Sequence, residues 1–174
     1  MIRFIVVFCL CLLLLVPLDL LQSVQLHVIL PFTTAIAHIA VWTVHAFDPT
    51  VVAQGNEIRR GIGGPGISIV AGCSGVEAVL ILVSAVLAFP APWKHKLTGV
   101  ALGFLAIQAL NLVRIISLFY LHEWSQVWFD WFHHYLWQAL IMLDALVFFL
   151  IWLRYLPREP VAAQIPVPPE PHAA

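Results

Sequence analysis

Long apolar segments constrain this chain more than any other feature of its sequence. A helix needs about 20 mostly apolar residues to cross the hydrocarbon core of a bilayer. Five segments meet or approach this requirement, at approximately residues 2–21, 24–47, 67–89, 97–121 and 131–156. Hydrophobic residues make up 62% of the chain and charged residues only 10%, well below the charged share of a soluble domain. The sequence therefore predicts an all-α integral membrane protein, a bundle of about five transmembrane helices.

A polar, glycine-rich stretch separates the second and third apolar segments. Its first part is centred on Gly55-Asn56, a pair that favours a tight turn between two strands. Residues 61–66 contain too many glycines for a helix, so we expect a loop there. The stretch is therefore predicted to form a short extracytoplasmic loop or hairpin.

The chain divides into a membrane domain at residues 1–156 and a proline-rich tail at residues 157–174, which we expect to be disordered. The distribution of Lys and Arg favours a cytoplasmic location for the turn after the third segment and for the tail. The glycine-rich stretch then faces outward. The basic residues that lie on the predicted cytoplasmic side are Lys94, Lys96, Arg154 and Arg158, against Arg3, Arg59 and Arg60 on the other.

Composition argues against several classes of protein. The net charge of −1 gives no basic surface for nucleic acid. The three cysteines, Cys9, Cys11 and Cys73, have neither the paired spacing of a disulfide framework nor a zinc-like arrangement with histidine. We therefore expect no metal ion and no organic cofactor.

Cys73 is the first candidate for chemistry. It follows the glycine-rich stretch and is predicted to lie in the opening turns of the third helix, where partial positive charge favours a thiolate. Glu77 follows one helical turn later on the same face. A cysteine between glycines is also compatible with a simple buried residue.

Arg114 is the second candidate, because it is the one Lys or Arg well inside a predicted span. An unpaired guanidinium in lipid costs about 3 kcal/mol or more, so Arg114 must face protein, water or an anion. Asn111 lies three residues earlier on the same helical stripe. A purely structural ion pair between Arg114 and Glu77 is the alternative interpretation.

His133 and His134 open the last apolar segment, and either ring could serve as a general acid or base. Because successive helices alternate in direction, Cys73, Arg114 and His133 are all predicted at the outward membrane face. Asp144, in the middle of the last segment, is expected to make a structural contact with another helix, for instance with a histidine of the second segment.

These residues also carry a resemblance to a known family. Three motifs, in this order, resemble the signature of the exosortase/archaeosortase family: Cys73-Ser74-Gly75, Asn111-Leu112-Val113-Arg114-Ile115, and a histidine that opens the last helix. The longer forms Cys-Ser-Gly-Val-Glu-Ala, from residue 73, and His-x-Tyr-Leu-Trp-Gln, from residue 133, resemble the exosortase H branch. The resemblance covers about residues 55–156, and the first two segments are similar only in being hydrophobic.

The resemblance implies a cysteine protease or transpeptidase of the bacterial inner membrane, with its active site facing the periplasm. Its partners would be secreted proteins whose C-terminal sorting signals, of the Ile-Pro-Thr-Leu type in this branch, are cleaved and transferred to an acceptor that the sequence does not identify. By this similarity Cys73 is the nucleophile, Arg114 the essential arginine and His133 the histidine, with His134 as the alternative ring. Asn111 and Glu77 would orient Arg114.

Two other functions remain open from the sequence. In the first, the chain is a non-catalytic membrane protein whose buried polar residues fix helix packing, so that replacing the cysteine is tolerated. In the second, it is a small proton-coupled transporter that uses the histidines of the second segment. Transporters of that kind usually carry paired repeats with broken helices, and the sequence has no such repeat.

Overall fold

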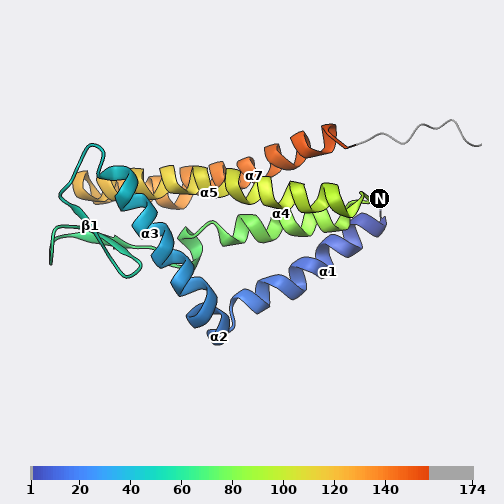
Figure 1. Cartoon of the computed structure of the whole chain (residues 1–174), viewed down its shortest axis with the longest axis horizontal. Helices are drawn as coiled ribbons and strands as arrows, with labels where there is room; N and C mark the ends of the chain where they lie inside the picture. Colours follow the sequence, from blue (N-terminus) through green and yellow to red (C-terminus); the bar gives the residue numbers. More distant parts are fainter. Residues whose placement is uncertain (1, 157–174) are drawn as a thin grey trace, which may run out of the picture.

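A computed structural model describes residues 2–156, which form a helical bundle with a small sheet at one end (Figure 1). The predicted disordered tail, residues 157–174, lies outside the described residues. The elements in chain order are α1 (Ile2–Asp19), α2 (Gln22–Val24), η1 (Gln25–Ile29), α3 (Leu30–Val44), β1 (Val51–Gln54), β2 (Glu57–Arg60), β3 (Gly66–Ser68), η2 (Ala71–Cys73), α4 (Val76–Ala88), α5 (Trp93–Trp124), α6 (Gln126–Trp131), η3 (Phe132–Leu136) and α7 (Trp137–Arg154).

Helices α4, α5 and α7 lie side by side and form the centre of the bundle (Figure 1). Their facing side chains make one apolar core, which includes Leu82, Ile107 and Ile141. Small residues allow α5 to approach its neighbours closely, as is common between membrane helices. A Cβ added at Gly103 would lie 2.2 Å from Cδ2 of Leu82, and one added at Gly99 would lie 2.3 Å from Nε1 of Trp152. Both glycines therefore set the spacing of the bundle.

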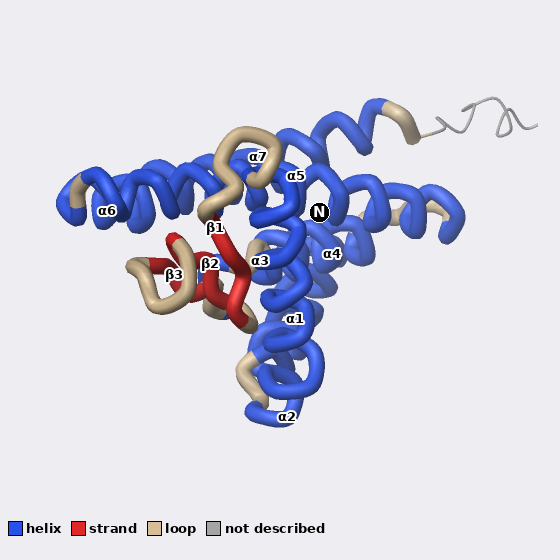
Figure 2. Tube along the Cα trace, turned by 60° about the vertical axis from the view of Figure 1, so that its left-hand side comes forward, coloured by secondary structure: helices blue, strands red, loops and turns tan. Residues whose placement is uncertain are grey.

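A second core joins α3 to the sheet and to the C-terminal half of α5. Val44, Ile58, Ile115 and Phe119 are all buried in it. The sheet is antiparallel with the strand order β1-β2-β3, and its register pairs Val51 with Arg60 and Ile58 with Ile67. Strands β1 and β2 contact α3, and β3 contacts α5. Figure 2 shows β3 on the side of the sheet away from α3.

Four stretches of helix are long and apolar enough to cross a membrane: Ile2–Asp19, Gln22–Val44, Trp93–Trp124 and Gln126–Arg154. The helix α4 is also apolar but has only 13 residues. It is shorter than the predicted span at residues 67–89, because the chain from residue 66 to residue 75 forms β3, η2 and a left-handed glycine instead. At its other end, the Lys96 ammonium donates to the Leu87 carbonyl at 2.8 Å and closes the last turn of α4.

The predicted hairpin at Gly55-Asn56 is confirmed, with Gly55 at a φ of 61° between β1 and β2. The predicted loop at residues 61–66 is confirmed up to residue 65, and β3 lies mainly in residues that were predicted to begin the third span. Residues 122–130, between the fourth and fifth predicted spans, are almost entirely helical, because α5 continues to Trp124 and α6 begins at Gln126, with Ser125 alone extended. The helical backbone continues through the aromatic residues that follow, so the last span begins earlier than residue 131.

Candidate active site

Cys73 ends the short 3-10 turn η2, and its N–H donates to the Val70 carbonyl at 2.9 Å. The next helix, α4, begins only at Val76, because Gly75 before it is left-handed with a φ of 74°. The predicted position of Cys73 inside the opening turns of that helix is therefore wrong by three residues. Its thiol lies in a connection that follows the sheet directly, and its position is set by this connection and by the residues packed against it.

Two side chains of α5 hold this connection in place. The Gln108 amide donates from Nε2 to the Ser74 carbonyl at 3.2 Å. A Cβ added at Gly75 would lie 3.2 Å from that same nitrogen and 3.2 Å from Cγ of Asn111. A residue with a side chain fits poorly at position 75, both because of these contacts and because of the positive φ. Gln108 was not singled out from the sequence, since a glutamine on a helix gives no distinctive pattern.

His133 meets Cys73 from the other side of the site. The Cys73 sulfur lies 3.8 Å from Nδ1 and 3.7 Å from Nε2 of His133. His133 belongs to η3, a π-helical turn between α6 and α7, and such turns occur frequently at functional sites. Its ring stacks almost parallel on Phe129, with the centroids 5.4 Å apart. The fold thus brings together a thiol and an imidazole that are 60 residues apart in the chain.

His134 is placed differently. Its Nδ1 is 2.9 Å from the carbonyl oxygen of Asp130, one turn earlier in its own helix. It touches the site only through an edge-to-face contact with the His133 ring, at 4.9 Å between centroids. Of the two candidate histidines, the geometry therefore favours His133 as the partner of Cys73.

Arg114 is almost fully buried, with 2% of its surface exposed. Its Nε has no hydrogen-bond partner, and among residues 2–156 no carboxylate forms a salt bridge with it. The alternative of a direct ion pair with Glu77 is thus not observed. Both residues instead line a cavity of about 10 Å³, together with Gly75 and Gln138. A space of this size holds about one water molecule, which could join the two side chains.

Asn111 is also completely buried, and its Oδ1 has no hydrogen-bond partner. Its Nδ2 lies 3.5 Å from Oε1 of Gln108. The described contacts of Asn111 therefore lead toward Gln108 and Gly75, on the side of the Cys73 connection. Asn111 was expected to orient Arg114, but no direct hydrogen bond between the two side chains is seen among the described residues.

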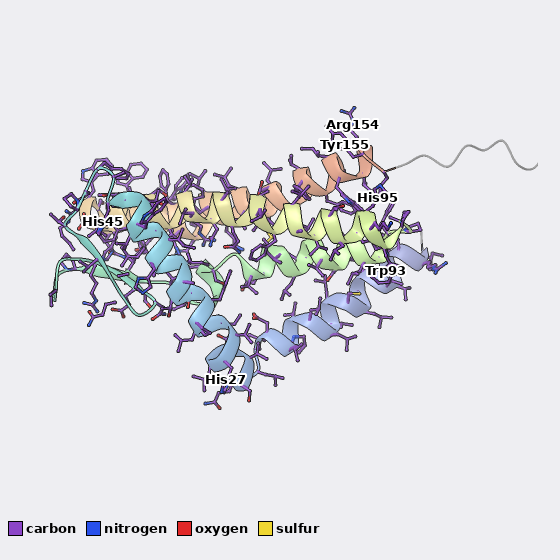
Figure 3. All side chains as sticks on the ribbon, viewed as in Figure 1. His27, His45, Trp93, His95, Arg154 and Tyr155 are labelled. Carbon is purple, nitrogen blue, oxygen red and sulfur yellow. The ribbon has the colours of Figure 1, made fainter. Side chains whose placement is uncertain are left out.

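Asp144 does not make the expected contact with a histidine of the second segment. Its buried Oδ2 has no partner among the described residues. Figure 3 shows His27 and His45 at opposite ends of that segment. His27 contacts the Ser23 carbonyl at 2.9 Å and His45 the Val51 carbonyl at 2.7 Å. Local backbone contacts thus engage one nitrogen of His27 and one of His45.

Burial raises the pKa of the Cys73 thiol, while the nearby positive charge of Arg114 acts against this rise and Glu77 adds to it. The expectation of a lowered pKa is therefore wrong for the free protein. The sulfur sits in a largely apolar setting rather than on the N–H groups of a helix end. A thiolate at this position depends on its charged and proton-accepting neighbours, Arg114 and His133.

Cys73 and His133 line one cleft, with a volume of about 220 Å³. One wall is the chain segment 67–70, and the other contains Ile115, Leu118 and His122 of α5, with Phe129 of α6. Most of these side chains are apolar. His122 was missed as a site residue because it lies just beyond residue 121, the predicted end of the fourth span. The signal that could have found it is its spacing of seven residues from Ile115, two turns of one helix face.

A polar network fixes the sheet that contributes one wall of this cleft. The Arg60 guanidinium forms an ion pair with Glu123 at the end of α5, and it also donates to Asp48 at 3.1 Å. Hydrogen bonds from Thr50, and further ones from Tyr120 and Arg60, lower the pKa of Asp48 to about 2. The strand β2 is thereby tied to the same helix that carries Arg114.

No group of three or more His, Cys, Asp or Glu side chains within residues 2–156 is arranged to hold a metal ion. The site therefore offers a thiol, an imidazole and a buried guanidinium. A thiol and an imidazole in contact can carry out nucleophilic attack and proton transfer.

Comparison with known families gives one match. The sequence model described as transmembrane exosortase (Exosortase_EpsH) matches residues 1–153, which is nearly the whole chain and includes the first two helices. No curated protein and no solved structure matches. Together with the four helices able to cross a membrane, the match confirms the predicted fold class, a helical multi-pass membrane protein.

Proposed function

Since the chain belongs to the transmembrane exosortase family, we propose that it is a membrane-embedded cysteine protease and transpeptidase that cleaves the C-terminal sorting signals of exported proteins. The observation that carries this proposal is the contact between Cys73 and His133, at 3.7 and 3.8 Å from the sulfur to the two ring nitrogens. Catalytic contacts are often longer in a free enzyme than in its substrate complex.

In the first half of the reaction, His133 accepts the thiol proton and the Cys73 sulfur attacks the scissile carbonyl. The carbonyl π bond opens to an oxyanion, and the positive charge of Arg114 stabilises it. When the oxyanion collapses, the C–N bond breaks and the proton on His133 passes to the leaving amine. The C-terminal part of the signal departs, and the exported protein remains as a thioester on Cys73.

In the second half, His133 removes a proton from an acceptor nucleophile or from water, which then attacks the thioester. The C–S bond breaks and the thiolate regains its proton from His133. Water as the acceptor gives a free carboxylate, whereas an amine or hydroxyl of the cell envelope gives a transferred product. Both outcomes use the same residues, so the acceptor is decided by what can enter the cleft.

The setting we propose is the bacterial inner membrane, with the cleft facing the periplasm. Basic residues support this orientation, because Lys94 and Lys96 lie in the first turn of α5, at the end of the bundle where Figure 3 shows Trp93 and His95. Figure 3 shows Arg154 at that same end. Arg3 lines a cleft with Lys96, so its predicted place on the opposite side is wrong. The substrate signal is of the Ile-Pro-Thr-Leu type, followed by one apolar helix and a basic end. That helix would lie in the bilayer beside the bundle and bring the motif to the cleft.

The test is the conversion of an exported reporter protein that ends in Ile-Pro-Thr-Leu, an apolar helix and a basic tail, co-expressed with the chain in cells that lack other exosortases. Mass spectrometry of the reporter then locates the new C-terminus and any added group. We expect processing to be lost in Cys73→Ala, His133→Ala and Arg114→Ala. His134→Ala is the matched control, because it removes the neighbouring ring, and we expect it to process the reporter at the original rate.

The opposite results have definite meanings. If Cys73→Ala processes the reporter normally, the chain is not a cysteine transpeptidase. If His134→Ala is inactive while His133→Ala is active, the assignment of the acting ring is wrong although the reaction class stands.

A further inference from the structure

The strand β3 is an edge strand whose outer side has no partner. It pairs with β2 on one side only, since the sheet has the order β1-β2-β3. The register places Ser68 opposite Glu57 and Ile67 opposite Ile58. The free side of β3 is the one away from β2, β1 and α3 (Figure 2).

The hydrogen-bond pattern shows which groups of β3 are free. The Ile69 N–H donates to the Asn56 carbonyl at 2.9 Å, and the Arg60 N–H donates to the Pro65 carbonyl at 3.0 Å. Hydrogen-bonded pairs alternate along antiparallel strands, so the backbone of Ser68 points away from β2. Neither its N–H nor its carbonyl oxygen has a hydrogen-bond partner within residues 2–156. Such a row of unpaired groups is a template for another strand.

This free edge belongs to the cleft that contains Cys73 and His133. Four consecutive residues, 67–70, line it. Successive side chains of an extended segment point to opposite faces, so a run of four neighbours can line one cleft only if the segment presents its backbone edge. The edge continues into the nucleophile, because the Val70 carbonyl accepts the Cys73 N–H.

The opposite wall suits an extended peptide as well. Ile115 and Leu118 present apolar surface of α5 to the cleft, and His122 follows on the same helix face. The buried Nδ1 of His122 has no hydrogen-bond partner in the described part of the chain. An extended peptide would pair its backbone donors and acceptors with the edge of β3 and place alternate side chains against the apolar surface of α5.

We propose that the sorting signal binds as a fourth strand on the free edge of β3, with its backbone paired to Ser68 and one side chain in the apolar wall of the cleft. The strand pairing would deliver the scissile carbonyl to Cys73, because β3 leads directly to that residue. This inference rests on the proposed function and specifies how its substrate is held.

The first test compares two substitutions at one position. Ser68→Pro removes the outward N–H but leaves the bonds between β2 and β3, since proline is tolerated at the open side of an edge strand. Ser68→Ala removes only the hydroxyl. We expect Ser68→Pro to process the reporter about tenfold more slowly than Ser68→Ala. A tenfold change corresponds to the loss of one hydrogen bond whose free energy lies near the upper end of the usual range. Ser68→Ala, which keeps the backbone N–H, gives the reference rate for this comparison.

A second measurement protects the test against misfolding of the proline variant. In a chain with Ser68→Cys and Cys73→Ala, and with Cys9 and Cys11 replaced by serine, the remaining thiol can form a disulfide with single cysteines placed along the reporter signal. Strand pairing predicts disulfides at every second signal position, because alternate residues face the same side. Both measurements have a readout that does not depend on the identity of the acceptor.

Strand docking is overturned if Ser68→Pro processes the reporter as fast as Ser68→Ala, or if the disulfides form without a two-residue period. In either case the loss of processing in Cys73→Ala would still support the proposed function. If the unsubstituted chain leaves the reporter intact, the proposed function and this inference both fall.

Discussion

The substitution Gly75→Ala tests how strictly the connection after Cys73 is positioned. Gly75 has a φ of 74°, and an L-residue in this left-handed conformation costs about 1–2 kcal/mol. The added Cβ would also lie 3.2 Å from both the Gln108 amide nitrogen and Cγ of Asn111. Crowding of this kind costs at least about 1 kcal/mol in a packed interior. We therefore expect a total of about 2–3 kcal/mol in the native state.

Part of this strain can be relieved only by moving the connection, and Cys73 moves with it. A misplacement of about 1 Å at a reacting group can reduce a rate about 100-fold. We expect Gly75→Ala to lower the thermal midpoint of the purified protein in detergent by about 5–10 °C. The rate of reporter processing should fall at least about tenfold, even at temperatures where the variant remains folded.

Gly72→Ala is the matched control on the other side of Cys73. Gly72 has no positive φ, and a Cβ added there would have no atom within 4 Å. We expect its thermal midpoint and its processing rate to stay at the original values. If Gly75→Ala behaves like Gly72→Ala in both assays, the connection between Cys73 and α4 is not tightly held, and Gly75 has no role in placing the thiol.

Three further outcomes are expected. Arg60→Gln should make the hairpin at residues 51–69 more sensitive to limited proteolysis. Arg59→Gln loses contacts only with its own strand and the adjacent loop, so it should change the cleavage rate less. Equal effects would show that the ion pair between Arg60 and α5 does not hold the hairpin in place. Because the folded pKa of Asp48 lies near 2, below its ordinary 3.8, its stabilising effect is present above about pH 4 and is lost as the pH falls toward 2. The thermal midpoint of the original chain should therefore exceed that of Asp48→Asn at pH 5, and the difference should shrink between pH 4 and 2; a constant difference would contradict the assignment. Alkylation of Cys73 by iodoacetamide can be followed by mass spectrometry in a chain without other cysteines. The labelling rate should be low at pH 7 and rise with pH, and Arg114→Gln should lower it further. Fast labelling at pH 7 would show that burial does not govern the pKa of this thiol.

The sequence predicted the helical architecture because membrane helices are specified by length and apolarity, which can be read directly. The alternation of helices also placed Cys73 and His133 at one end of the bundle. Their contact depends on features that carry weaker signals. The π-helical turn at Phe132–Leu136 sets the direction of the His133 ring, and nothing in the residue types there distinguishes it from an ordinary helix.

The strand β3 could not be predicted for a related reason. It has three residues and exists only because β2 pairs with it, so its stability comes from a partner and not from its own composition. The cleft then follows from β3 and from the continuation of α5 to Trp124, beyond the predicted end of the fourth span at residue 121. The alternative reading, a direct pair of Arg114 and Glu77, is not observed, because the two side chains line a cavity between them. The spacing of residues along the chain does not distinguish these two arrangements.

The shortness of α4 has a consequence for the lipid around it. At about 1.5 Å per residue its 13 residues rise about 20 Å, while the hydrocarbon core is about 30 Å thick. Hydrophobic mismatch of this size thins the bilayer locally or leaves one end of the helix submerged. If Lys96 lies at the headgroups at the opposite end, the Cys73 sulfur, just before α4, would lie below the headgroups on its own side. Under the proposed function, a sorting signal would then reach Cys73 by moving laterally within the membrane.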